Sequence, residues 1–93
     1  MLFLDKLKTK DAQFCVIGLG YVGLPLAVEV AKVGIHVTGV EVDPEKVKKI
    51  NAGINYIGDV KDNELKAVVD KGLLTATLDF SVIGKMDVVS ICV

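Results

Sequence analysis

The sequence contains no arginine, because all 11 of its basic residues are lysines. Arginine is the side chain that binds phosphate and carboxylate groups through two parallel hydrogen bonds. Any phosphate site in this chain must therefore depend on lysine or on backbone amides. An excess of either charge is also lacking, since 12 acidic residues balance the basic ones and the formal net charge is −1. Such a mixture attracts neither nucleic acid nor an anionic membrane, and we expect neither as a partner.

Long apolar runs and cysteines are scarce as well. Glu29 and Lys32 interrupt the longest apolar stretch, which stays short of the roughly 18 to 20 residues needed to cross a bilayer. Charged residues also break the N-terminal stretch, so it does not read as a secretory signal. The two cysteines, Cys15 and Cys92, lie in apolar segments and are too few for a metal-ligand cluster. These features predict a reduced, cytoplasmic protein without a metal site.

Hydrophobic residues make up 52% of the 93-residue chain, which predicts a packed domain that is part of a larger fold. Residues 1–11 are amphipathic and are expected to form an N-terminal arm or short helix. In residues 12–93, apolar runs alternate with stretches of helical spacing. The expected strands cover 14–17, 35–42, 75–78 and 87–93; the expected helices cover 21–33, 44 to about 53, and the segment between a cap at Asp62 and Gly72, with one helical turn at 80–83.

Three glycines mark the first strand-to-helix junction, in the stretch "VIGLGYVGLPLA" at residues 16–27. Gly18, Gly20 and Gly23 have the G-x-G-x-x-G spacing of dinucleotide-binding turns. In such turns the first glycine allows a sharp exit from the strand, the second admits a pyrophosphate close to the backbone, and the third lets the helix pack against the sheet. Free amides and the helix dipole then bind the phosphates. The spacing alone also fits glycines that serve packing only.

An acidic residue at the end of the second expected strand favours the binding interpretation. Glu41 follows Gly18 by 23 residues, close to the roughly 20 residues typical of the acid that binds the cofactor ribose. A carboxylate there accepts hydrogen bonds from both ribose hydroxyls and repels a 2′-phosphate, which favours NAD over NADP. Asp43 is a second candidate for the ribose, although its place before Pro44 favours a helix N-cap. Lys46 either reaches a cofactor phosphate or stays solvated.

Together these patterns predict an α/β fold with a Rossmann-type, doubly wound parallel sheet. Its first half is expected here, in strand order 3-2-1-4 and truncated after the fourth strand, so residues 12–93 form a partial NAD-binding domain. Tyr21 offers its backbone amide to the cofactor whether or not its ring lies in the core. The expected cofactor contacts are Gly18, Leu19, Gly20, Tyr21, Val22, Gly23, Glu41, Asp43 and Lys46.

No catalytic grouping accompanies this predicted site. The sequence shows neither a Ser/His/Asp pattern nor paired carboxylates, which nucleophilic or acid–base catalysis would use. His36, the single histidine, falls near the start of a strand and is expected to be structural or exposed. We therefore predict no catalytic residue in this chain and no turnover of substrate by the chain alone.

The stretches "VIGLGYVGLPLA", "VTGVEVDPEKVKKINAG" and "NYIGDV" resemble the N-terminal domain of the nucleotide-sugar 6-dehydrogenases, the UDP-glucose/GDP-mannose dehydrogenase family. The resemblance covers nearly all of residues 12–93. The "GYVGLP" part is more specific than the glycines, and the "YI" of the later loop looks most like enzymes that act on UDP-N-acetylhexosamines. The resemblance implies an NAD-dependent cytoplasmic homo-oligomer of polysaccharide biosynthesis. Such an enzyme oxidises the C6 alcohol of a UDP-sugar to a carboxylate in two hydride transfers, through a thioester on a cysteine.

Carried onto this sequence, the resemblance implies pyrophosphate binding at residues 18–23, ribose binding at Glu41 and a basic residue near the cofactor at Lys46. Many relatives have aspartate where this chain has Glu41. Val93 matches the residue before a Pro-Thr-Pro loop that lines the cofactor site. The catalytic cysteine of the family matches neither Cys15 nor Cys92.

Two other functions share these features. A β-hydroxyacid dehydrogenase of the 6-phosphogluconate type also opens with Gly-Leu-Gly but usually continues with Asn or Met and Gly, in place of the "YVGLP" found here. A regulatory module that senses NAD would keep the glycines and the acidic residue without any catalytic group.

Overall fold

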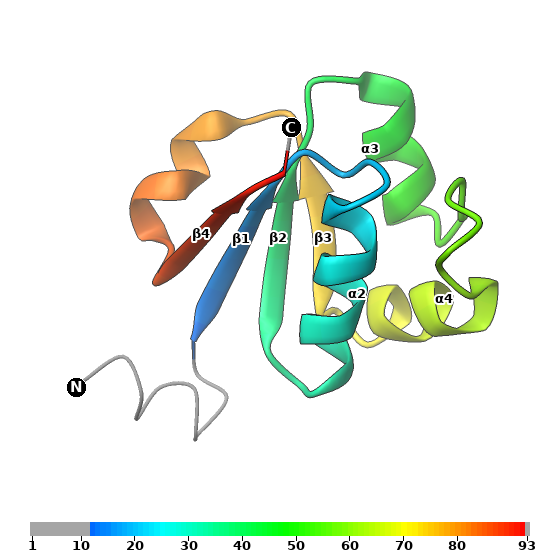
Figure 1. Cartoon of the computed structure of the whole chain (residues 1–93). Helices are drawn as coiled ribbons and strands as arrows, with labels where there is room; N and C mark the ends of the chain where they lie inside the picture. Colours follow the sequence, from blue (N-terminus) through cyan, green and yellow to red (C-terminus); the bar gives the residue numbers. More distant parts are fainter. Residues whose placement is uncertain (1–11, 93) are drawn as a thin grey trace.

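Four parallel strands form the centre of the computed structural model, which describes residues 12–92. Their order is β3-β2-β1-β4 (Figure 1), which confirms the predicted strand order and the first half of a Rossmann-type sheet. The expected arm at residues 1–11 and the predicted contact Val93 lie outside the described residues. The elements in chain order are β1 (Gln13–Ile17), α2 (Gly23–Lys32), β2 (His36–Val40), α3 (Pro44–Asn51), α4 (Asp62–Asp70), β3 (Leu74–Thr77), the 3-10 helix η1 (Phe80–Lys85) and β4 (Val88–Ile91).

Helices α2, α3 and α4 gather on one side of the strands, and η1 lies on the other side (Figure 1). Val37 of β2 is paired with Phe14 of β1 and Leu74 of β3, and neighbours in parallel register point to the same face of a sheet. This face packs on the apolar sides of the helices. The helical residues buried in this core include Leu24, Ala27, Val28, Ala31, Ile50, Leu65 and Val68, and within each helix they have the spacing of a single helix face.

Two element boundaries differ from the sequence-based expectation near the glycine turn. Helix α2 begins at Gly23 and not at Tyr21, because Tyr21 and Val22 still belong to the turn and expose their side chains. Strand β2 ends at Val40, and Glu41 follows it. The amide of Glu41 still donates to the carbonyl of Thr77 at 3.0 Å, while its side chain reaches the glycine turn. None of the helices in the 12–92 segment is long and apolar enough to cross a membrane.

The prediction that Asp62 is the N-cap of the third long helix, α4, is also wrong. Asp62 is the first residue of α4, and Lys61 occupies the N-cap position without a side-chain hydrogen bond. The carboxylate of Asp62 instead accepts a hydrogen bond from Nδ2 of Asn55 at 2.9 Å, which ties it to the preceding loop. The single turn expected at 80–83 is a longer 3-10 helix, capped by Asp79, whose carboxylate accepts from the Ser81 amide at 2.9 Å.

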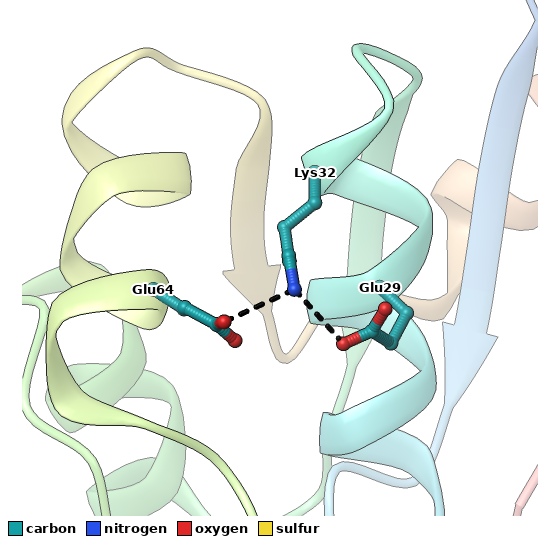
Figure 2. A network of polar contacts seen from close by, with 3 residues as sticks. All are labelled: Glu29, Lys32 and Glu64. Carbon is teal, nitrogen blue, oxygen red and sulfur yellow. Dashed lines mark hydrogen bonds and ion pairs between the residues drawn. The ribbon is translucent and has the colours of Figure 1, made fainter.

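An ion-pair network joins two of the helices. Nζ of Lys32 lies 3.2 Å from a carboxylate oxygen of Glu29 on α2 and 3.1 Å from one of Glu64 on α4 (Figure 2). Hydrogen bonds to Glu64 and Glu29 raise the pKa of Lys32. All three side chains are at least partly exposed, and exposed ion pairs contribute little stability. The network therefore orients α2 relative to α4, while the buried core supplies most of the stabilisation.

Asn51, the last residue of α3, binds the outer edge of the sheet. Its side-chain amide donates to the carbonyl of Ala76 at 2.9 Å, and its Oδ1 accepts from the amide of Ala76 at 2.8 Å. Ala76 lies in β3, an edge strand whose outward backbone groups would otherwise need water or another strand. Asn51 satisfies both groups and connects α3 to the sheet.

We expect Asn51→Ala to lower the free energy of unfolding by about 1–2 kcal/mol, because it removes both partners of buried backbone groups. Urea denaturation followed by circular dichroism measures the change. Asn63→Ala is the matched control, since Asn63 is exposed on α4 and the hydrogen bonds of the described residues do not include its side chain. Equal losses for the two variants would contradict the role given to Asn51.

Candidate functional site

A pocket of about 320 Å³ opens at the carboxyl ends of the strands. Four segments contribute to its wall, and the one after β4 contributes Cys92. Gly18 and Gly20 come from the turn after β1, Glu41 and Lys46 from the junction of β2 with α3, and Phe80 from the start of η1. Open α/β sheets bind ligands at this end, where loops from neighbouring strands meet. The topology therefore brings together the glycine motif and the acidic residue that the sequence singled out.

Gly18 and Gly23 allow the turn and helix α2 to approach each other. Gly18 has a φ of 93°, in the left-handed region that favours glycine, and its amide donates to the carbonyl of Val40 at 2.8 Å. A Cβ on Gly23 would collide with the carbonyl group of Gly18 and would approach the side chain of Cys92. Close packing of backbone on backbone therefore requires glycine at position 23.

Gly20 differs from the other two glycines because the space beside it is open. A Cβ built there would meet no atom within 4 Å, although Gly20 lines the pocket. Among the hydrogen bonds of residues 12–92, none is donated by the amides of Gly20, Tyr21, Val22 or Gly23. Amides at the start of a helix carry partial positive charge and bind anions. This turn can thus hold an anion with backbone groups, one of the two means that remain in a chain without arginine.

Leu19 anchors the turn from inside. Its side chain is fully buried and lies so close to Gly39 of β2 that a Cβ there would come within 2.6 Å of Leu19 Cδ1. Its amide donates to Oε1 of Glu41 at 3.0 Å. Of the amides expected to face a diphosphate, that of Leu19 is therefore already bound within the protein.

Glu41 is 7% exposed and lines the pocket. Its Oε1 accepts from the Leu19 amide at 3.0 Å and its Oε2 from the Asp43 amide at 2.9 Å. Burial raises the pKa of this carboxyl group, but the two amides and the positive charge of Lys46 outweigh burial and hold the pKa below its ordinary value. An ionised carboxylate offers about four acceptor positions, so positions remain for the hydroxyl groups of a ligand.

The other predicted residues take distinct places. Asp43 is the N-cap of α3, where its carboxylate accepts from the Glu45 amide at 3.0 Å, which confirms the capping prediction. Lys46 lines the pocket and places Nζ 5.8 Å from the centre of the Tyr56 ring. The ring of Tyr21 is 80% exposed, so it does not belong to the core.

Sequence reasoning missed several residues around this pocket, among them Val42, which follows Glu41. Phe80 and Cys92 line it, and they come just after β3 and β4, so their position after strand ends was the available signal. The hydroxyl of Tyr56 donates to the carbonyl of Leu19 at 2.6 Å. No local pattern indicates this contact, because the two residues are 37 positions apart.

The arrangement around the pocket offers groups that can bind a ligand. Across the described range 12–92, no three His, Cys, Asp or Glu side chains lie close enough to hold a metal ion. Cys15 is buried, and burial raises the pKa of its thiol, which disfavours the reactive thiolate. Anionic and hydroxylated parts of a ligand have partners here, whereas the described residues show no nucleophile beside a base.

Known proteins match both the sequence and the fold. UDP-N-acetyl-D-mannosamine dehydrogenase of Pyrococcus horikoshii is 38% identical over 82 residues, which cover 87% of this chain and 20% of that relative. A solved structure of UDP-D-ManNAc dehydrogenase from the same organism has a TM-score of 0.79 at 37% identity, covering 87% of this chain and 20% of that one. GDP-mannose dehydrogenase of Pseudomonas aeruginosa, solved as a ternary complex, has a TM-score of 0.79 at 34% identity. The match covers 86% of this chain and 19% of that one.

The chain thus spans about a fifth of the length of these relatives. Residues 12–93 match the family model of the UDP-glucose/GDP-mannose dehydrogenase family, NAD binding domain, and confirm the resemblance seen in the sequence motifs. The chain therefore belongs to the UDP-glucose/GDP-mannose dehydrogenase family, within which it corresponds to the NAD binding domain.

Proposed function

We propose that this chain is the NAD-binding part of a nucleotide-sugar 6-dehydrogenase, which oxidises the C6 alcohol of a UDP-sugar to the uronic acid with two NAD. The observation that carries the proposal is that Gly20 and the Glu41 carboxylate line one pocket, and that among the hydrogen bonds of residues 12–92 none is donated by the Gly20 amide or by the amides that follow it in the turn. NAD carries the complementary groups, a diphosphate and an adenosine ribose with two free hydroxyls. When bound, it accepts a hydride from the carbon that is oxidised.

The diphosphate, the adenosine ribose and the adenine of the cofactor each have a partner in this assignment. The diphosphate lies on the amides of the turn between Gly18 and Gly23, and the ribose hydroxyls donate to Glu41. Lys46, at the pocket wall, adds a positive charge near the cofactor. The exposed apolar side chains of Val42 and Phe80 also line the pocket and suit the flat face of adenine. Val93 remains a predicted contact on the basis of the family resemblance.

The substrate of the whole enzyme is proposed from its relatives. Several similar proteins are named UDP-N-acetyl-D-mannosamine dehydrogenase, and one of Pseudomonas aeruginosa is named UDP-N-acetyl-D-glucosamine 6-dehydrogenase. A UDP-N-acetylhexosamine is therefore the substrate class that we assign, with polysaccharide biosynthesis as the setting. Both cysteines are free thiols, which suits the reducing cytoplasm that we propose, and the proposal of a homo-oligomer rests on the family resemblance.

We expect the chain to bind NAD at least about tenfold more tightly than NADP, because the Glu41 carboxylate repels a 2′-phosphate and no arginine offsets it. Glu41→Gln should weaken NAD binding by about 10- to 100-fold, the range for a hydrogen bond to a charged group. The same substitution should also reduce the ratio of NAD affinity to NADP affinity. Isothermal titration calorimetry with both dinucleotides measures these affinities.

Glu45→Gln is the matched control for Glu41→Gln. It changes the net charge equally, but Glu45 is exposed in the first turn of α3. We expect it to leave both affinities within about twofold, as for most exposed substitutions. Equal binding of NAD and NADP by the unaltered chain would argue against the assignment of Glu41 to the ribose.

Gly20→Ala separates binding from folding. Because no atom lies within 4 Å of the added methyl group, the melting temperature should stay nearly constant. The methyl group nevertheless occupies the space where a diphosphate must approach the backbone, so NAD affinity should fall by about tenfold or more. Gly58→Ala, where the added Cβ also meets nothing within 4 Å, should change neither quantity. If Gly20→Ala binds NAD as the unaltered chain does, the diphosphate does not lie on this turn.

A further inference from the structure

Tyr56 lies in the loop between α3 and α4 and reaches the glycine turn from outside the pocket. Its half-buried ring packs against the hydrophobic core, and its hydroxyl donates to the carbonyl of Leu19 at 2.6 Å. The loop that carries it is itself held in place. The amide of Ile57 donates to Oδ1 of Asn55 at 2.9 Å, and the side chains of Ile57 and Val60 are buried. Tyr56 is therefore held in place by its own loop while its hydroxyl binds the backbone of the turn.

The contact determines the direction of a particular amide. The carbonyl of Leu19 and the N–H of Gly20 belong to one peptide group, which is trans and planar, so they point in opposite directions. Fixing the carbonyl therefore fixes the N–H as well. Glycine otherwise has wide conformational freedom, and no neighbouring atom restrains Gly20 from the side-chain direction. Among the hydrogen bonds of residues 12–92, the one from Tyr56 is the only one that the Leu19 carbonyl accepts, so its loss removes the direct restraint on the orientation of the peptide between residues 19 and 20.

We propose that Tyr56 is a positioning residue for dinucleotide binding: by holding the carbonyl of Leu19, its hydroxyl keeps the Gly20 amide in the orientation that receives the diphosphate. The role is exerted through the turn, since Tyr56 is not among the residues that line the pocket. The inference rests on the proposed binding of NAD and adds to it a residue that no glycine or acidic motif reveals.

The surroundings of Tyr56 keep its hydroxyl protonated, so that it can donate a hydrogen bond. Burial, together with the negative charges of Glu41 and Asp43, raises the pKa of Tyr56 to about 12, so the hydroxyl keeps its proton at neutral pH. Lys46 places Nζ 5.8 Å from the ring centre, within the range of a cation–π contact. The ring of Tyr56 thus contacts Lys46 of the pocket wall, while its hydroxyl contacts the backbone of the turn.

Tyr56→Phe tests the proposal because it removes only the hydroxyl and keeps the ring in the core. In ¹H–¹⁵N spectra of the free chain, the Gly20 amide signal should shift or broaden. In titrations with ADP and NAD, affinity should fall by about fivefold to tenfold, the effect of losing one hydrogen bond. Adenosine, which has no phosphate, should bind as it does to the unaltered chain. A purely structural role would lower the melting temperature without changing the ratio of ADP to adenosine affinity.

Thr75→Val is the matched control, since it removes an exposed hydroxyl from β3 and should leave the Gly20 signal and all affinities unchanged. If the unaltered chain binds NAD, and the Tyr56→Phe variant binds ADP as tightly as the unaltered chain does, only the role of Tyr56 is overturned. If the unaltered chain binds no NAD, the proposed function fails, and the Gly20 signal of the free Tyr56→Phe chain then decides whether Tyr56 holds the turn. An unchanged Gly20 signal overturns the role of Tyr56 in either case.

Discussion

The buried carboxylate of Glu41 joins the two loops on which the site depends. One of its oxygens accepts the amide of Leu19 and the other accepts the amide of Asp43, so a single side chain fixes the turn after β1 relative to the start of α3. A buried charge is unfavourable unless it is hydrogen-bonded. Here the two amides supply that compensation and hold the pKa of the carboxyl group low, which keeps it ionised and able to accept further hydrogen bonds.

Backbone groups take over the role that arginine side chains fill in many phosphate sites. For amides to serve this purpose, the turn must approach the ligand closely and helix α2 must begin close to the sheet. Gly18 and Gly23 meet these conditions through a left-handed turn and a contact between backbones. The open space beside Gly20 then leaves room for a ligand. Three glycines in one turn thus have three separable physical roles.

Binding and chemistry are separate in the proposed enzyme. The described residues supply partners for a dinucleotide at the carboxyl ends of the strands, while a nucleophile with an adjacent base is not found among them. The chain spans about a fifth of the relatives that it matches. Under the proposal, residues beyond this chain hold the sugar nucleotide and carry out the oxidation, and the turn anchored by Leu19 holds the cofactor in place for them.

The sequence by itself determined the parallel strand order, the buried face of α2, the cap at Asp43 and the roles of Gly18 and Gly23 in the turn. The helix face, the cap and the glycine turn follow from short-range spacing, because apolar periodicity and turn chemistry act over a few residues. The strand order follows from the alternation of strands and helices, which implies parallel strands joined by right-handed crossovers. Only the tertiary structure decided that Asn51 binds Ala76, that the Leu19 amide is taken by Glu41, and that Tyr56 holds the Leu19 carbonyl. Each of these contacts joins residues more than 20 positions apart, and their meeting depends on the path of loops, which no local pattern encodes.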